Sequence, residues 1–109
     1  MLVKFILEVE GDISVVGEAI DGHEAIDAAQ THAPDVVLLD ISMPKMDGIT
    51  ALPLIRQASP RSRVVMLTGF STDEIRQRCA DLGAVEFLAK GVIASDIVDA
   101  VRRAAALPA

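Results

Sequence analysis

The stretch Asp35-Val36-Val37-Leu38-Leu39-Asp40 decides the fold of this chain. Its central residues are all apolar, whereas a strand with one face in solvent alternates between apolar and polar residues. A continuous apolar run of this kind is typical of a central strand in a parallel sheet with helices on both faces. We therefore predict an α/β fold in which the sheet is buried between layers of helices.

Strand-like and helix-like segments alternate on both sides of this run. Short runs rich in β-branched residues predict strands at residues 13–16, 36–39, 64–67 and 85–88. Apolar residues at helical spacing predict helices around residues 25–29, 49–55, 75–82 and 97–101. Strand–helix–strand repeats of this length pair in parallel through right-handed crossovers, so the expected architecture is a three-layer parallel α/β sheet.

The residues between these segments suit helix ends. Asp21-Gly22 opens the first helix, Ser71-Thr72-Asp73-Glu74 opens the third, and Ser95-Asp96 opens the last, and these segments carry side chains that cap helix N-termini. Gly83 follows the third helix, where a left-handed residue often ends a helix.

The composition excludes several classes of protein. The chain has 109 residues, which suits a single domain over residues 1–109, and 51% of them are apolar, which excludes intrinsic disorder. A net charge of −6 argues against direct binding to nucleic acid. One cysteine permits neither an internal disulfide nor a cysteine metal cluster. No membrane span or signal peptide is found, so a soluble cytoplasmic domain without an output domain is expected.

Polar side chains follow three of the predicted strands. Asp40 ends the buried strand, Thr68-Gly69 follows the strand at 64–67, and Lys90 follows the strand at 85–88. Ligands of open parallel sheets bind beyond the carboxyl ends of the strands. A carboxylate, a hydroxyl and an ammonium at one edge suit a phosphoryl group on the carboxylate, with the other two groups holding its oxygens.

These residues resemble the receiver domains of two-component response regulators. The resemblance lies in the block Asp40-Ile41-Ser42-Met43-Pro44-Lys45-Met46-Asp47-Gly48, in Thr68-Gly69, and in Lys90 with Phe87 three residues before it. Residues 13–25 are similar to the second strand and helix of the subfamily that often carries a helix-turn-helix output domain. The resemblance implies a flavodoxin-like fold with the strand order 2-1-3-4-5.

The resemblance also implies a role for each matching residue. Asp40 would accept a phosphoryl group from a histidine kinase, and Thr68, Lys90 and the backbone of Gly69 would bind it. Thr68 and Phe87 would form the switch, although Phe87 is equally well explained as a core residue. Mg²⁺ would be held by Asp40 and the backbone carbonyl of Ser42. Family members commonly dimerise through the fourth helix, fifth strand and fifth helix, and they act as signalling switches, not as enzymes.

The chain departs from the family pattern at its start. The first strand and its pair of adjacent acids are apparently missing, about 15–20 residues by mean element length, and residues 1–12 resemble the end of the first helix. A hairpin that makes residues 1–9 a strand, with Glu8 and Glu10 as the acids, is the alternative, but that strand would be antiparallel. Either a late assigned start or a true truncation explains the pattern. Magnesium is expected to bind weakly or not at all, and acetyl phosphate should modify Asp40 little.

Further departures leave other functions open. Gly91 stands where the family usually has proline, which leaves the aim of Lys90 less defined. A pseudo-receiver that works only through protein contacts, independently of phosphorylation, is the main alternative. A phosphatase of the haloacid dehalogenase type is disfavoured, because Ser42 occupies the position of its second aspartate.

Overall fold

The computed structural model describes residues 10–69, 72–89 and 91–107. In this part of the chain, helices and strands alternate as the sequence predicts. The elements are α2 (Gly22–His32), β1 (Val36–Asp40), α3 (Gly48–Ala58), β2 (Arg63–Thr68), α4 (Asp73–Asp81), β3 (Glu86–Ala89) and α5 (Ala94–Ala105).

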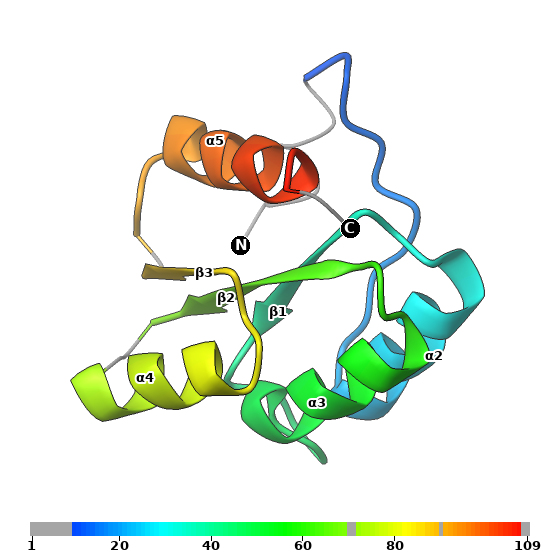
Figure 1. Ribbon diagram of the computed structural model, residues 1–109, viewed down its shortest axis with the longest axis vertical. Helices are drawn as coiled ribbons and strands as arrows, with labels where there is room; N and C mark the ends of the chain where they lie inside the picture. Colours follow the sequence, from blue (N-terminus) through cyan, green and yellow to red (C-terminus); the bar gives the residue numbers. More distant parts are fainter. Residues whose placement is uncertain (1–9, 70–71, 90, 108–109) are drawn as a thin grey trace.

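The strands form one parallel sheet in the order β1-β2-β3. Val36 of β1 lies opposite Arg63 of β2, and Val65 of β2 lies opposite Glu86 of β3. Figure 1 shows α2, α3 and α4 on one side of the sheet and α5 on the other. The predicted three-layer parallel α/β architecture is therefore confirmed.

Side-chain caps fix where three of the helices begin. Asp21 accepts a hydrogen bond from the Glu24 N–H at 2.9 Å at the start of α2. Asp47 does the same for Thr50 at the start of α3, at 2.8 Å. Thr72 caps α4 through the Ile75 N–H at 3.2 Å, and these bonds satisfy amides that a helix leaves without internal partners.

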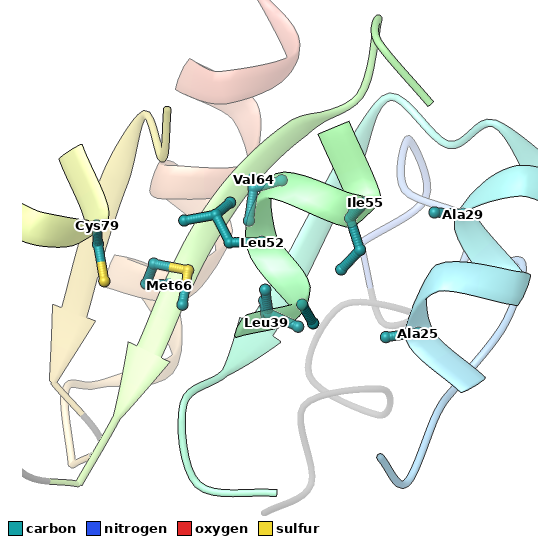
Figure 2. Packing of buried hydrophobic residues seen from close by; sticks show 9 residues of the cluster. Ala25, Ala29, Leu39, Leu52, Ile55, Val64, Met66 and Cys79 are labelled. Carbon is teal, nitrogen blue, oxygen red and sulfur yellow. The ribbon is translucent and has the colours of Figure 1, made fainter. Parts of the chain in front are cut away.

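The larger part of the core lies between the sheet and the helices α2, α3 and α4. Its buried residues come from all three helices and from β1 and β2, and Figure 2 shows eight of them labelled: Ala25, Ala29, Leu39, Leu52, Ile55, Val64, Met66 and Cys79. We call this set, together with Ala51, the lower core. Alternate strand residues point to opposite faces, so Val64 and Met66 enter the lower core while Val65 packs toward α5.

The opposite face of the sheet is covered by α5. Ile97, Val98 and Val101 form one buried cluster there, and Ala100 and Ala104 pack with Val65 in another. The apolar run of β1 therefore has helices on both faces, as its composition predicts. The prediction of a central strand does not hold for the described residues, because β1 lies at one edge of the sheet and β2 lies in the middle.

The predicted strand at residues 13–16 is wrong. Residues 13–19 have no regular secondary structure, and they belong to no sheet in the described part of the chain. Ile13 and Val15 pack against the α5 cluster, and Val16 is 52% exposed, so the segment keeps the side-chain alternation of a strand. Alternation is a property of the local sequence, whereas ladder hydrogen bonds need a neighbouring strand in register.

The predicted start of the last helix and the predicted remnant of a first helix have different outcomes. The last helix begins at Ala94 after the N-cap residue Ile93, which gives no side-chain cap, so the predicted start at Ser95-Asp96 is slightly wrong. The expectation that residues 1–12 form a remnant of a first helix falls mostly outside the described residues, since only residues 10–12 are described and they lie in a turn. Among the helices of the described segments, none has the length and apolarity to cross a membrane.

Candidate functional site

The carboxyl ends of the three strands meet at one edge of the sheet. Asp40, the last residue of β1, lies opposite Leu67 in β2. The next residue of β2, Thr68, lies opposite Ala89, the last residue of β3. Consequently the predicted carboxylate and hydroxyl come from the ends of neighbouring strands (Figure 1).

The carboxylate of Asp40 is oriented by the backbone that follows it. The side chain is partly buried, and its Oδ1 accepts a hydrogen bond from the Ser42 N–H at 2.9 Å. The Ile41 N–H donates to the Leu67 carbonyl at 3.3 Å, which extends the contact between β1 and β2 by one residue. These bonds hold the carboxylate at the end of the strand and limit its rotation.

Gly48 fixes the far end of the loop that follows Asp40. Its N–H donates to the Ile41 carbonyl at 2.9 Å, and its Cα lies so close to the backbone of Asp40 that a Cβ would overlap the carbonyl group of Asp40. Only glycine permits this approach. The Asp40-to-Gly48 block of the sequence thus closes into a compact loop whose two ends touch.

The same loop is docked on the start of α2. The Gly22 N–H donates to the Met46 carbonyl at 3.1 Å. Lys45 adopts a left-handed backbone with φ 65, and its Nζ lies 4.0 Å from Oδ2 of the buried Asp21. Reasoning from the sequence treated Asp21 only as a helix opener and gave Lys45 no role, because no local pattern joins residues so far apart.

Thr68 is almost fully buried, with 2% of its surface exposed. Its position in β2 gives it the same facing as Val64 and Met66, toward the side of the sheet covered by α3 and α4. Gly69 follows it in an exposed bend. The Thr68 side chain is therefore buried at the carboxyl edge of the sheet, and the next residue, Gly69, is exposed there.

Phe87 lies on the same side of the sheet. It is partly buried and packs against the lower core, opposite Met66. The guanidinium of Arg76 lies over its ring, with Cζ 5.1 Å from the ring centroid. From the sequence alone, no role was assigned to Arg76.

The third strand end is described only in part. Lys90, the predicted ammonium of the site, lies outside the described residues. Gly91 has φ +99, a backbone conformation open to glycine and closed to proline, whose ring fixes φ near −65. The glycine at this position therefore gives the turn after β3 a backbone conformation that a proline could not adopt.

The acids that begin the described chain lie away from this edge. Arg102 of α5 donates two hydrogen bonds to Asp12, at 3.1 and 2.8 Å, and one to Glu10 at 2.9 Å. Since α5 starts after β3 and runs back across the sheet, its last turn lies at the amino ends of the strands. Glu10 therefore does not lie beside Asp40. The hairpin alternative, which needs Glu8 and Glu10 as the acids of the site, is not supported by the position of Glu10.

Among the described residues, no three His, Cys, Asp or Glu side chains lie together so that they could hold a metal ion. Asp40 and the backbone of Ser42 are the candidate ligands of the sequence analysis. One carboxylate and one carbonyl would leave most of the six oxygen positions around Mg²⁺ to water, which fits weak binding.

Comparison with known proteins identifies what the chain resembles. The profile of the family described as "Response regulator receiver domain" matches residues 1–102. The chain is 38% identical over 102 residues to the uncharacterized transcriptional regulatory protein YxjL of Bacillus subtilis, covering 94% of this chain and 47% of that protein. It is 42% identical over 97 residues to the response regulator protein VraR of Staphylococcus epidermidis, covering 89% of this chain and 46% of that protein. The chain thus spans about half the length of these curated relatives.

The fold has close matches among solved structures. The signal receiver domain of the putative response regulator NarL from Mycobacterium tuberculosis superposes with a TM-score of 0.89 at 36% identity. The match covers 94% of this chain and 83% of that one.

Proposed function

This chain belongs to the response regulator receiver family, and on that premise we propose that it accepts a phosphoryl group on Asp40 from a histidine kinase. The carboxylate oxygen attacks the phosphorus of the donor, the phosphorus–nitrogen bond of the phosphohistidine breaks, and an aspartyl phosphate forms. The observation that carries the proposal is the position of Asp40. It ends β1, a strand with helices packed on both of its faces, and the Ser42 N–H orients its carboxylate.

The neighbouring strand end supplies the second part of the proposal. Thr68 lies next to the residue opposite Asp40, so its hydroxyl is placed to bind a phosphoryl oxygen once the group is attached. The exposed backbone of Gly69 is the adjacent candidate donor. Lys90 follows Ala89, the residue opposite Thr68, and in this proposal its ammonium neutralises another phosphoryl oxygen.

The consequence of phosphorylation is a change of surface, not the turnover of a separate substrate. We assign that surface to α4, β3 and α5, because α4 and β3 directly follow the strand end that carries Thr68. In this proposal the partners are the histidine kinase and a second copy of the chain, and the protein works in the cytoplasm. No step is assigned to Mg²⁺, since the described residues do not form a site for it.

Acetyl phosphate, a small phosphoryl donor, tests the acceptor. We expect slow and incomplete addition of one phosphoryl group, detected by intact mass and located on Asp40 by peptide mapping. Asp40→Asn should abolish it. Asp35→Asn is the matched control, because it removes an exposed carboxylate beside the opposite end of the same strand.

Each outcome of this experiment is informative. Modification that persists in Asp40→Asn overturns the proposal. If Asp40 stays unmodified at long incubation, the chain is a pseudo-receiver that acts only through protein contacts. Rapid, stoichiometric modification of Asp40 would support the acceptor and contradict the expected weakness of the magnesium site.

A further inference from the structure

The contact between Arg76 and Phe87 joins a helix to the strand beside it. Arg76 is an exposed residue of α4, and Phe87 is a half-buried residue of β3. Their separation of 5.1 Å lies within the roughly 6 Å over which the face of an aromatic ring attracts a cation. The guanidinium thus covers one face of a ring that also contacts the lower core.

Arg76 differs from other arginines of the described chain in the partner that orients it. Arg102 and Arg103 each make two hydrogen bonds to one carboxylate, that of Asp12 and that of Glu86. On α4 itself, the carboxylate of Asp81 accepts a hydrogen bond from Gln77. Among the described residues, Arg76 instead places its guanidinium over the ring of Phe87.

The strand beneath the ring is held independently of Arg76. Glu86, the residue before Phe87, accepts bonds from Arg103 of α5 at 3.0 and 2.8 Å. Phe87 lies opposite Met66, a fully buried residue of the central strand β2. The backbone position of Phe87 is therefore fixed by contacts that do not involve Arg76.

Phe87 is also a neighbour of the proposed phosphoryl site. Thr68 lies opposite Ala89, two residues beyond Phe87, and residues two apart on a strand face the same side of the sheet. Thr68 and Phe87 are thus diagonal neighbours on one face. The helix that carries Arg76 begins at Asp73, shortly after Thr68, and Cys79 is its only fully buried side chain.

We propose that Arg76 is a positioning residue that holds the ring of Phe87 against the lower core and so sets the resting state of this strand edge. Any rotamer that takes the ring from beneath the guanidinium loses the cation–π contact. At an exposed site, such a contact changes the ratio of two conformers about two- to fivefold. As a regulatory role, the inference rests on the proposed phosphorylation of Asp40.

Fluorine NMR of the protein labelled with 4-fluorophenylalanine tests this role before any phosphorylation. The chain has three phenylalanines, and Phe87→Leu assigns the resonance of interest. Arg76→Met keeps the length of the side chain and removes the charge. We expect it to shift the Phe87 resonance and to raise the population of its minor environment about two- to fivefold, whereas Arg76→Lys should restore most of the original signal.

Arg78→Met is the matched control, because Arg78 is another exposed arginine of α4. It should leave the Phe87 resonance unchanged, and thermal unfolding of all variants checks that the fold is kept. The inference is overturned if Arg76→Met and Arg78→Met give the same Phe87 spectrum, or if Arg76→Lys behaves like Arg76→Met.

Treatment with acetyl phosphate separates this inference from the function on which it rests. If Asp40 is modified, Arg76→Met should alter the response of the Phe87 resonance to modification, and an unaltered response counts against the regulatory role. If the parent chain takes no phosphoryl group, the proposed function fails. A Phe87 shift in Arg76→Met would then still support Arg76 as the residue that positions the ring.

Discussion

At the scale of single residues, Gly48 sets how closely α3 can approach Asp40. An alanine here would gain up to about 1 kcal/mol of helix propensity. Its Cβ would overlap the backbone of Asp40 and Ile41, which cannot rotate away as a side chain can. We therefore predict that Gly48→Ala lowers the free energy of unfolding by about 1–3 kcal/mol, the usual cost of overpacking. Urea denaturation measures it.

The control for this substitution is Gly11→Ala. An added Cβ at Gly11 has no neighbour within 4 Å, so little change in stability is expected. Equal stability of Gly48→Ala and the parent would mean that the loop after Asp40 can open without cost, which would contradict the close approach described above.

At the scale of elements, Arg102 ties the turn at residues 10–13 to α5. The hydrogen bonds from Arg102 hold the pKa of Asp12 below its ordinary value. A carboxyl group with a lowered pKa in the folded state stabilises the fold above its unfolded pKa, and that contribution disappears as the pH falls through the folded value. We predict that Asp12→Asn lowers stability near neutral pH and that the difference from the parent shrinks as the pH falls through the lowered pKa of Asp12.

Denaturation midpoints measured from about pH 7 to about pH 2 check this prediction. Asp99→Asn is a suitable control, since Asp99 is an exposed acid on α5, the helix that carries Arg102. A difference between Asp12→Asn and the parent that stays constant over the whole range would show that the carboxylate contributes nothing through its charge.

The boundaries of most elements follow from local sequence, and this explains where prediction succeeds. The predicted helix openers Asp21-Gly22 and Ser71-Thr72-Asp73-Glu74 contain the N-caps Asp21 and Thr72, because a cap needs only the next few residues. Gly83 was predicted to end a helix and has φ +104. Residues 13–16 have the same local signature as the strands, but a strand also needs a neighbour. That residues 13–16 lie outside the sheet could not be derived from those residues alone.

At the scale of the whole molecule, the candidate site was predictable where it depends on topology. Parallel strands with buried runs bring their carboxyl ends to one edge, so Asp40 and Thr68 were placed on neighbouring strand ends from the sequence. The contacts of Lys45 with Asp21 and of Arg76 with Phe87 were not predictable in this way. Each joins an exposed cation to a buried or partly buried side chain of another segment, and the approach of the two depends on how helices and loops pack.

The distribution of stability over the molecule follows from the same sheet. β2 pairs with a strand on each side, and most of its side chains are fully buried. Residues 14–19 have no regular secondary structure and pair with no strand in the described structure. Amides outside a ladder exchange with solvent through small local openings, whereas those of a central strand require larger ones. Hydrogen–deuterium exchange should therefore be slowest in β2 and many-fold faster at residues 14–19. Protection of residues 14–19 equal to that of β2 would mean that they form a strand in solution, and the sheet order β1-β2-β3 would then be incomplete.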